Sequence, residues 1–202
     1  MIISNSRQFI FIKTRKTAGS TLEKLLFPYL DKHHDKCTGS ARDETPALNM
    51  PWNANGHVGY DFLNVEYPVA LRNYFVFTIE RNPWDKVVSS YHWHQKIKPQ
   101  EYGHMHFEDY IRTCTNVLPN DWPMYYKAQP TVFFYEKMEE MYDTLNEKLG
   151  LDISKESIYN TKLKSGIRTT GHYTEIHTPY TIERVGKLFA NEIKAYGYNY
   201  GN

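Results

Sequence analysis

The chain has 202 residues, with 24 Lys and Arg against 23 Asp and Glu, which gives a formal net charge of +1 at pH 7. This length suits one domain with a hydrophobic core, and the balanced charge predicts no general attraction to nucleic acid or to a membrane surface. The two cysteines lack C-x-x-C spacing and predict neither a disulfide framework nor a structural zinc site. No stretch reaches transmembrane length and no signal peptide is visible, so we expect a soluble, cytoplasmic protein.

The first predicted elements are an apolar strand at 9–12, a loop of small residues and a helix that includes 22–26. Backbone N–H groups of such a loop and of the helix N-terminus converge on a phosphate-like group, and Lys16 would add a full charge. A Walker A loop carries its lysine after the last glycine, whereas Lys16 precedes Gly19. The loop therefore predicts an anion site, but not one for the triphosphate of ATP or GTP. A solvated surface lysine is the alternative interpretation of Lys16.

The next stretch, 32–56, is polar without a clear period, and we interpret it as a long loop near the active site. A continuous apolar run at 73–79 then predicts a buried parallel strand.

A second cationic segment follows that strand directly. Asn82 suits a helix N-cap, Pro83 suits the first helical position, and Asp85 falls in the first turn, where the helix dipole favours an acid. Arg81 then lies at the carboxyl edge of the strand and Ser89 about two turns into the helix. Open α/β sheets bind ligands at this edge, so the two cationic segments predict a ligand with two separated anionic groups. An ion pair between Arg81 and Asp85 is the alternative role for Arg81.

The remaining elements have clear periods. We predict a helix at 107–114, a short buried strand at 131–135, and a helix at 138–149 that Gly150 closes. A last helix should start at 178–179 and continue to Gly197, with a buried face formed by Ile182, Val185, Phe189, Ile193 and Tyr196. His92 and His94 suggest a metal pair, but residues two apart on a helix do not face one another, so no metal is predicted.

Several of these segments resemble one known family. R-K-T-A-G-S-T at 15–21 resembles the 5′-phosphosulfate loop of sulfotransferases that use 3′-phosphoadenosine 5′-phosphosulfate. R-N-P-W-D-K-V-V-S-S-Y at 81–91 resembles their 3′-phosphate motif, an Arg followed eight residues later by a Ser. The segment 56–60 resembles the part of uronyl 2-O-sulfotransferases that carries the acceptor-side histidine, and 131–138 and 172–198 resemble later blocks of the family. The chain departs from the family at Arg15, where many members have proline, and at Ala18, which replaces a common glycine.

The resemblance implies a fold, a reaction and a set of site residues. The fold is α/β, a single domain over residues 1–202 with a P-loop-NTPase-like parallel sheet flanked by helices. The reaction moves a sulfuryl group from 3′-phosphoadenosine 5′-phosphosulfate to an acceptor hydroxyl, expected on a carbohydrate, with a small phenol or a lipid alcohol as alternatives. The implied donor-binding residues are Arg15, Lys16, Thr17, Ala18, Gly19, Ser20, Thr21, Arg81, Ser89 and Arg168.

Two residues are expected to carry the chemistry. Lys16 would neutralise the charge that grows on the leaving group, and His57 would accept the proton of the acceptor hydroxyl, because a histidine titrates near neutrality. Glu80 is the rival base. Two other functions stay open at this point, namely a nucleotide kinase-like transferase and a catalytically inactive module that binds adenosine 3′,5′-bisphosphate.

Overall fold

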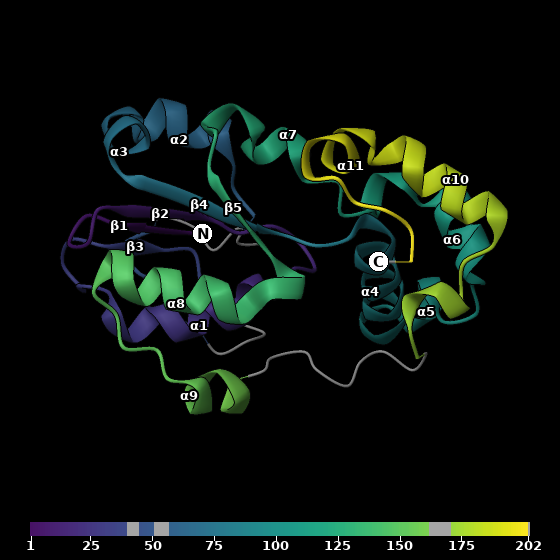
Figure 1. The fold of residues 1–202 in the computed structure, drawn as a ribbon, viewed down its shortest axis with the longest axis horizontal. Coiled ribbons are helices and arrows are strands. Elements are labelled where there is room, and N and C mark those ends of the chain that lie inside the picture. The colour runs from purple at the N-terminus through teal and green to yellow at the C-terminus, as the bar shows by residue number, and fades with distance from the viewer. Residues whose placement is uncertain (40–44, 51–56, 162–170, 202) are drawn as a thin grey trace. The chain divides into compact units, whose positions relative to one another are not determined.

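The computed structural model describes residues 1–39, 45–50, 57–161 and 171–201. The chain divides into two compact units (Figure 1). The first consists of Met1–Glu80 and Pro123–Leu163, and the second of Arg81–Trp122 and Lys164–Asn202. The boundary falls directly before Arg81, at the end of a central strand. The single domain expected over residues 1–202 stays a prediction.

The first unit is built on one sheet. Within the described residues its strand order is β3-β1-β2-β4-β5, and the strands are β1 (Ile2–Ser4), β2 (Phe9–Ile12), β3 (Lys36–Cys37), β4 (Phe75–Glu80) and β5 (Thr131–Phe134). The strands predicted at 9–12, 73–79 and 131–135 are therefore confirmed. The pairs β2–β4 and β4–β5 are parallel, whereas β1 runs antiparallel to both of its neighbours. The expectation of a parallel sheet is thus wrong for β1, because the short turn between β1 and β2 can only join antiparallel strands.

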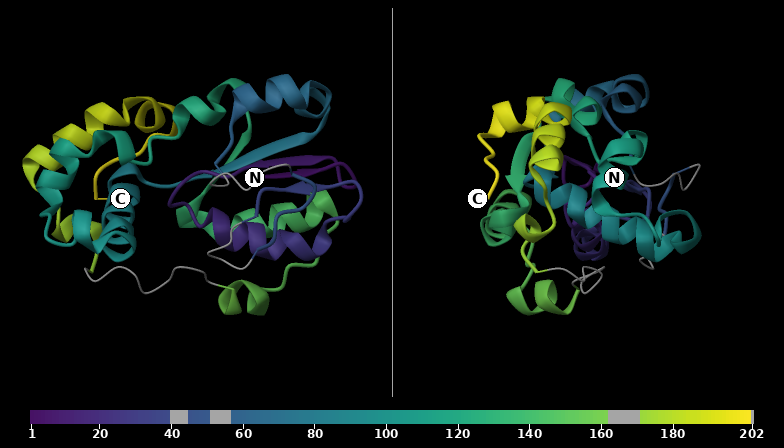
Figure 2. Two further views of the ribbon diagram at one scale, coloured as in Figure 1. Left: turned by 180° about the vertical axis from the view of Figure 1, so that it is seen from behind. Right: turned by 90° about the vertical axis from the view of Figure 1, so that its right-hand side faces the viewer.

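Helices cover both faces of this sheet. In Figure 1 and, from behind, in Figure 2, α1 (Gly19–Leu26) and α8 (Met138–Leu149) lie on one face, and α2 (Tyr60–Glu66) and α3 (Pro68–Asn73) lie on the other. Stacked rings of Phe11 and Phe77 form part of the core beneath α1 and α8. α9 (Lys155–Asn160) contacts α1.

The stretch at 32–56 is not simply a loop. Among its described residues, Lys36–Cys37 form β3, which pairs with β1, and Cys37 also bridges to Leu48. This edge pairing satisfies backbone groups that a bare loop would leave to solvent. Residues 40–44 and 51–56 lie outside the described residues.

The second unit is helical. Its helices are α4 (Pro83–Ile97), α5 (Pro99–Tyr102), α6 (Phe107–Thr113), α10 (Pro179–Leu188) and α11 (Ala190–Tyr196), while α7 (Trp122–Tyr125) spans the return to the first unit. The helix predicted at 107–114 is confirmed as α6. The single helix predicted up to Gly197 is wrong, because Phe189 leaves the helical region with φ −112° and ψ 25°. Its ring is buried in the core of this unit, so the apolar period continues across the break and conceals it.

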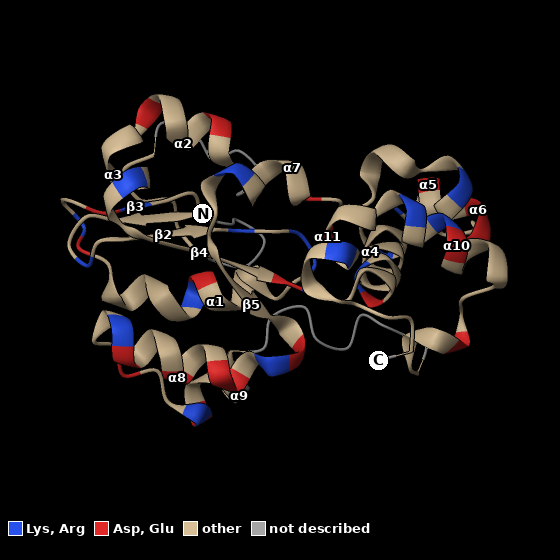
Figure 3. Ribbon diagram, turned by 45° about the horizontal axis from the view of Figure 1, so that its top comes forward, with Lys and Arg blue, Asp and Glu red and all other residues tan. Residues whose placement is uncertain are grey.

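Short 3₁₀ turns lie between these elements, namely η1 (Phe27–Tyr29), η3 (Thr115–Val117), η4 (Tyr126–Ala128), η5 (Tyr135–Lys137) and η6 (Tyr173–Glu175). Basic and acidic segments are interspersed on the helices of each unit (Figure 3). Among the described residues, no helix combines the length and the apolar character that crossing a bilayer demands.

Candidate functional site

The loop between β2 and α1 has an unusual main chain. Lys16 and Ala18 both adopt the left-handed region, each with φ 63°. A residue other than glycine pays about 1–2 kcal/mol for this conformation, and such strain concentrates at functional sites. Alternation of right- and left-handed residues forms a concave nest of N–H groups that suits an anion.

The start of α1 extends this surface. Ala18 is the N-cap, its methyl group accepts no hydrogen bond, and no acidic residue lies in the first turn. An anion would therefore complement the partial positive charge of this helix end. The predicted strand, loop and helix are thus present in the predicted order, with Lys16 inside the loop.

Two buried threonines brace the loop against the neighbouring strand. The hydroxyl of Thr14 donates to the carbonyl of Ile79 over 2.5 Å, and Thr17 Oγ1 lies 2.9 Å from Thr14 Oγ1. Because the single proton of the Thr14 hydroxyl is used toward Ile79, the Thr17 hydroxyl is the donor toward Thr14, whose carbonyl oxygen also lies 3.2 Å from it. The side chain of Thr17 therefore supports the loop, and a contact of its backbone N–H with an anion stays a prediction. Sequence reasoning missed Thr14.

A buried ion pair lies at the base of the same loop. Lys13 directly follows β2, and its ammonium lies 2.5 Å from Glu23 Oε2 on α1, with exposed fractions of 3% and 0% for the two residues. Burial alone would raise the pKa of Glu23, but the amino group of Met1 and Lys13 outweigh it and hold this pKa below its ordinary value. No periodicity or motif distinguished Glu23 from an ordinary helix acid, so sequence reasoning missed this pair.

His57 is brought to the base of the loop. Its Nδ1 lies 2.9 Å from the backbone carbonyl oxygen of Lys13, and its side chain is half-buried. The rival base Glu80 is the last residue of β4 and is completely buried. The structure therefore places the loop that contains Lys16 and the side chain of His57 in the first unit, where both adjoin Lys13.

Arg81 and Ser89 belong to the second unit. Arg81 Nε and Nη2 lie 2.7 Å and 2.6 Å from Asp85 Oδ2, so the ion pair considered as the alternative role is present. Two N–H groups on one edge of the guanidinium face this carboxylate, which fixes the plane of the side chain. Ser89 is half-buried, two turns along α4.

The predicted start of α4 is confirmed. Asn82 is the N-cap, its Oδ1 accepts from the N–H of Trp84 over 3.1 Å, and Pro83 occupies the first helical position. The Nδ2 group of Asn82 donates to the carbonyl of Asn199 over 3.1 Å.

The C-terminal segment secures this helix start further. The indole of Trp84 donates to Ile182 O over 3.0 Å and meets the ring of Tyr200 edge to face. Tyr173 Oη accepts from the N–H of Gly201 over 2.8 Å. Sequence reasoning predicted a helix in this C-terminal block and noted its resemblance to the family, but it did not foresee that the block supports the Arg81 segment.

Arg168 and the histidines of α4 were also considered as site residues from the sequence. Arg168 lies outside the described residues. The Nδ1 of His94 lies 2.8 Å from the hydroxyl of Tyr110, and its ring stacks on Tyr102. In the part of the chain that the structure describes, no three His, Cys, Asp or Glu side chains gather as a metal site would require.

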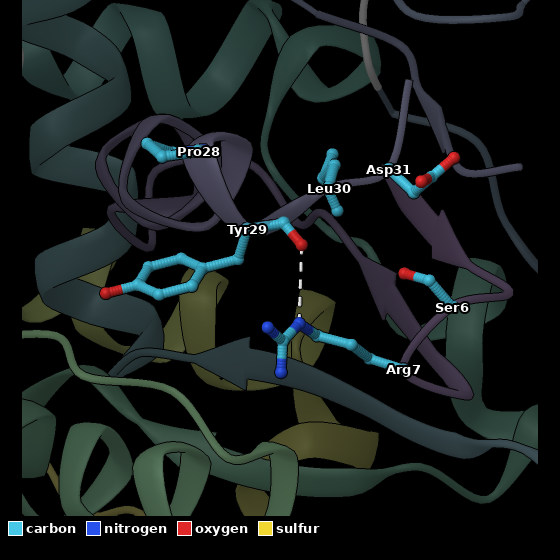
Figure 4. Close-up of a pocket in the computed structure, with 6 residues that line it drawn as sticks. All are labelled: Ser6, Arg7, Pro28, Tyr29, Leu30 and Asp31. Carbon is cyan, nitrogen blue, oxygen red and sulfur yellow. Dashed lines mark hydrogen bonds between the residues drawn. The ribbon is translucent and has the colours of Figure 1, made fainter. Parts of the chain in front are cut away.

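A separate hollow of about 530 Å³ lies at the other end of β2, where Ser6 and Arg7 face the turn at 28–31 (Figure 4). Arg7 donates there to the carbonyls of Tyr29 and Leu149, over 3.3 Å and 2.7 Å. Arg7 therefore caps the C-terminus of α8, a structural role that accounts for its charge.

Comparisons with known proteins identify the family of this chain and support its fold. A sequence profile described as "Sulfotransferase family" matches residues 1–199. Among solved structures, mouse sulfotransferase SULT7A1 complexed with PAP superposes with a TM-score of 0.60 at 12% identity, over 96% of this chain and 87% of that chain. That likeness confirms the predicted fold, and no curated protein matches the chain. Because the profile spans nearly the whole sequence, the chain belongs to the sulfotransferase family, a family of enzymes.

Proposed function

We propose that this enzyme moves a sulfuryl group from 3′-phosphoadenosine 5′-phosphosulfate to a hydroxyl group of a saccharide. The observation that carries the proposal is the loop in which Lys16 and Ala18 are both left-handed and lead directly into α1. Such a nest with a lysine inside it suits a phosphosulfate. The mouse sulfotransferase to which the chain is similar is complexed with PAP, that is adenosine 3′,5′-bisphosphate, and this agrees with the proposed donor.

The donor would be held by two groups of residues. The backbone N–H groups of the 15–21 loop and Lys16 bind the 5′-phosphosulfate, and Arg81 and Ser89 bind the 3′-phosphate. Arg168 is a further phosphate ligand by resemblance alone. The Asp85 carboxylate holds the plane of the Arg81 side chain, and a planar guanidinium suits a phosphate better than an ammonium does.

The chemical step follows from these positions. The acceptor hydroxyl oxygen forms a bond to sulfur while the bond from sulfur to the bridging phosphate oxygen breaks. Adenosine 3′,5′-bisphosphate leaves, and Lys16 neutralises the charge that develops on its oxygen. The hydroxyl proton passes to His57 Nε2, since Nδ1 faces the Lys13 carbonyl. The complete burial of Glu80 favours His57 as the base.

The saccharide acceptor rests on the resemblance of 56–60 to the histidine segment of uronyl 2-O-sulfotransferases. It is tested by a screen of labelled sulfate transfer to oligosaccharides, phenols and small alcohols. Transfer to a phenol or alcohol alone would exclude the saccharide while leaving the reaction intact.

The donor is tested by thermal shift with three ligands. Adenosine 3′,5′-bisphosphate should raise the melting temperature strongly, whereas AMP and ATP–Mg²⁺ should raise it little, because a ligand of the native state stabilises by RT ln(1 + [L]/Kd). Stabilisation by ATP–Mg²⁺ above that by adenosine 3′,5′-bisphosphate would instead indicate a kinase-like transferase. Binding without any sulfate transfer would indicate an inactive module.

A further inference from the structure

The Lys13–Glu23 pair is confined from several sides. Glu23 Oε1 lies 2.9 Å from the amino group of Met1 and 3.3 Å from the hydroxyl of Thr38, while Oε2 receives Lys13. A Cβ atom placed on Gly19 would come within 2.9 Å of Lys13 Cγ, so the lysine stem passes close against the first residue of α1. The direction of the Lys13 side chain is therefore set by α1.

A buried ion pair is weak evidence for stability, because the loss of solvation offsets much of the attraction between the charges. What such a pair does supply is a fixed geometry for the residues that carry it. Here one of these residues, Lys13, is also the residue whose backbone carbonyl meets His57.

The contact to His57 determines which ring nitrogen is basic. A carbonyl oxygen only accepts hydrogen bonds, so Nδ1 must carry a proton to bond to the carbonyl of Lys13 at 2.9 Å. In the neutral imidazole the lone pair then lies on Nε2, and the tautomer of a histidine is set in this way by the bond that its other nitrogen makes.

We propose that Lys13 and Glu23 are positioning residues for the base His57, a role that rests on the proposed function of this site. The Lys13–Glu23 pair anchors the Lys13 main chain, and the anchored carbonyl holds His57 in the tautomer with basic Nε2. Neither residue touches the reacting atoms. The donor loop and the acceptor-side base thereby share one support.

The tautomer can be measured directly. In the ¹⁵N spectrum of the full chain at neutral pH, with His57 assigned by its loss in His57→Gln, Nδ1 should show the shift of a protonated nitrogen and Nε2 that of an unprotonated one. In Glu23→Gln the Lys13 carbonyl loses its anchor, so the two shifts should move toward those of a mixture of tautomers.

The matched control is Asp35→Asn. Asp35 is another fully buried carboxylate of the first unit, and its partners are Ser4, Ser6 and Asp31 rather than Lys13 or His57. This variant should leave the His57 shifts as in the wild type. If Glu23→Gln does not fold, the double variant Lys13→Met/Glu23→Gln removes both charges of the pair and should show the same change of tautomer.

Turnover gives a second readout. Glu23→Gln should lower turnover by about 5–10-fold, which corresponds to the free energy of one hydrogen bond. This loss is far smaller than the roughly 10²–10⁴-fold loss expected for His57→Ala. Affinity for adenosine 3′,5′-bisphosphate should stay within about twofold, since the donor loop keeps its Thr14 and Thr17 braces.

The outcomes separate the two proposals. A wild-type His57 protonated at Nε2, or an unchanged tautomer in both Glu23 variants, overturns the positioning role. A changed tautomer with wild-type turnover supports the anchoring of the carbonyl and overturns His57 as the base.

Discussion

The two cationic segments of this enzyme are stabilised in opposite ways. The loop at 13–18 holds a strained main chain, and its supports come from other elements, namely Ile79 on β4 and Glu23 on α1. The segment at 81–89 is an ordinary helix start. Its N-cap Asn82 and the Asp85 carboxylate lie within four residues of Arg81, and the C-terminal segment adds contacts to Asn82 and Trp84.

Because of this difference, mutations in the two segments should affect different properties of the enzyme. A loop held by tertiary contacts should lose geometry, and hence catalysis, when a support is removed. A helix start held by its own cap should lose stability first. Variants in the two segments test this difference.

The largest effect is expected for Lys16→Ala in the loop. Removing one preorganised donor at a developing charge lowers turnover by about 10²–10³-fold, and loss of a full charge should cost at least as much. Labelled sulfate transfer measures the change, and circular dichroism checks that the fold survives. Lys24→Ala, which removes a half-buried lysine from the last turn of α1, is the control and should keep normal turnover. Turnover of Lys16→Ala within a few-fold of the wild type would remove Lys16 from the mechanism.

Arg81→Ala should change affinity rather than chemistry. Hydrogen bonds to a charged group contribute about 1.5–3 kcal/mol each, so affinity for adenosine 3′,5′-bisphosphate should fall about 10–150-fold. Affinity for AMP, which lacks the 3′-phosphate, should change little in the same calorimetric titrations. Arg112→Ala, at an exposed arginine paired with Glu108 on α6, should affect neither ligand. Equal losses for the two nucleotides would show that Arg81 only supports the helix start through Asp85.

The same contrast explains which features the sequence could predict. The apolar run at 73–79 and the order Asn82-Pro83 carry local signals, and both were found where predicted. The left-handed conformations of Lys16 and Ala18 carry no such signal, since neither residue favours them. The apolar strand, the small residues and the following helix located this loop, but residue properties did not predict its left-handed shape.

Glu23 shows the limit most clearly. On a helix a glutamate normally faces solvent, and its burial here depends on Lys13, Thr38 and Met1 meeting at one point. The pairing of β3 with β1 and the helix break at Phe189 depend in the same way on tertiary contacts. Local caps and periods therefore predicted the elements, whereas the buried polar network that supports the site was visible only in the fold.

Asp35→Asn tests whether the first unit as a whole depends on buried polar groups. Asp35 accepts from the N–H of Ser6 and of Asp31 and from the hydroxyls of Ser4 and Ser6. An amide can accept at only one of the two oxygen positions, so we expect a loss of about 1.5–3 kcal/mol in the free energy of unfolding at neutral pH.

The stability that Asp35 contributes should depend on pH. Burial alone would raise the pKa of Asp35, but the Ser6 hydroxyl and the backbone N–H groups of Ser6 and Asp31 hold it below its ordinary value. A carboxylate whose pKa is lowered in the folded state stabilises that state at pH values above its unfolded pKa of about 3.9. This stabilisation disappears as the pH falls through the folded pKa. Urea unfolding below pH 4 should thus show a shallower decline in Asp35→Asn than in the wild type, and identical slopes would contradict the prediction.

Asn82→Ala should destabilise α4 by about 1 kcal/mol, since it removes an N-cap. Asn82→Asp separates the two functions of this side chain, because a carboxylate caps Trp84 equally well but cannot donate to Asn199. Urea unfolding should therefore place Asn82→Asp between the wild type and Asn82→Ala. A value for Asn82→Asp equal to that for Asn82→Ala would show that the tether to the C-terminal segment, and not the cap, holds the helix start, and would weaken the contrast with the loop.

The smallest effect is expected at the junction of the loop and α1, where two adjacent positions should respond with opposite signs. Ala18 is left-handed at φ 63°, so Ala18→Gly relieves about 1–2 kcal/mol of strain while the added freedom of the unfolded chain returns about 0.4–1 kcal/mol. The net result is a gain in unfolding free energy of about 0–1.6 kcal/mol, with the loop geometry and turnover retained. Gly19→Ala, in contrast, would place a methyl group 2.9 Å from Lys13 Cγ and 3.4 Å from the Thr14 carbonyl, and Lys13 is held by Glu23. That variant should be less stable and less active, because the clash moves the residue that supports both the loop and His57. Destabilisation by Ala18→Gly would contradict backbone strain at position 18. Wild-type behaviour of Gly19→Ala would contradict the close packing of Lys13 against α1.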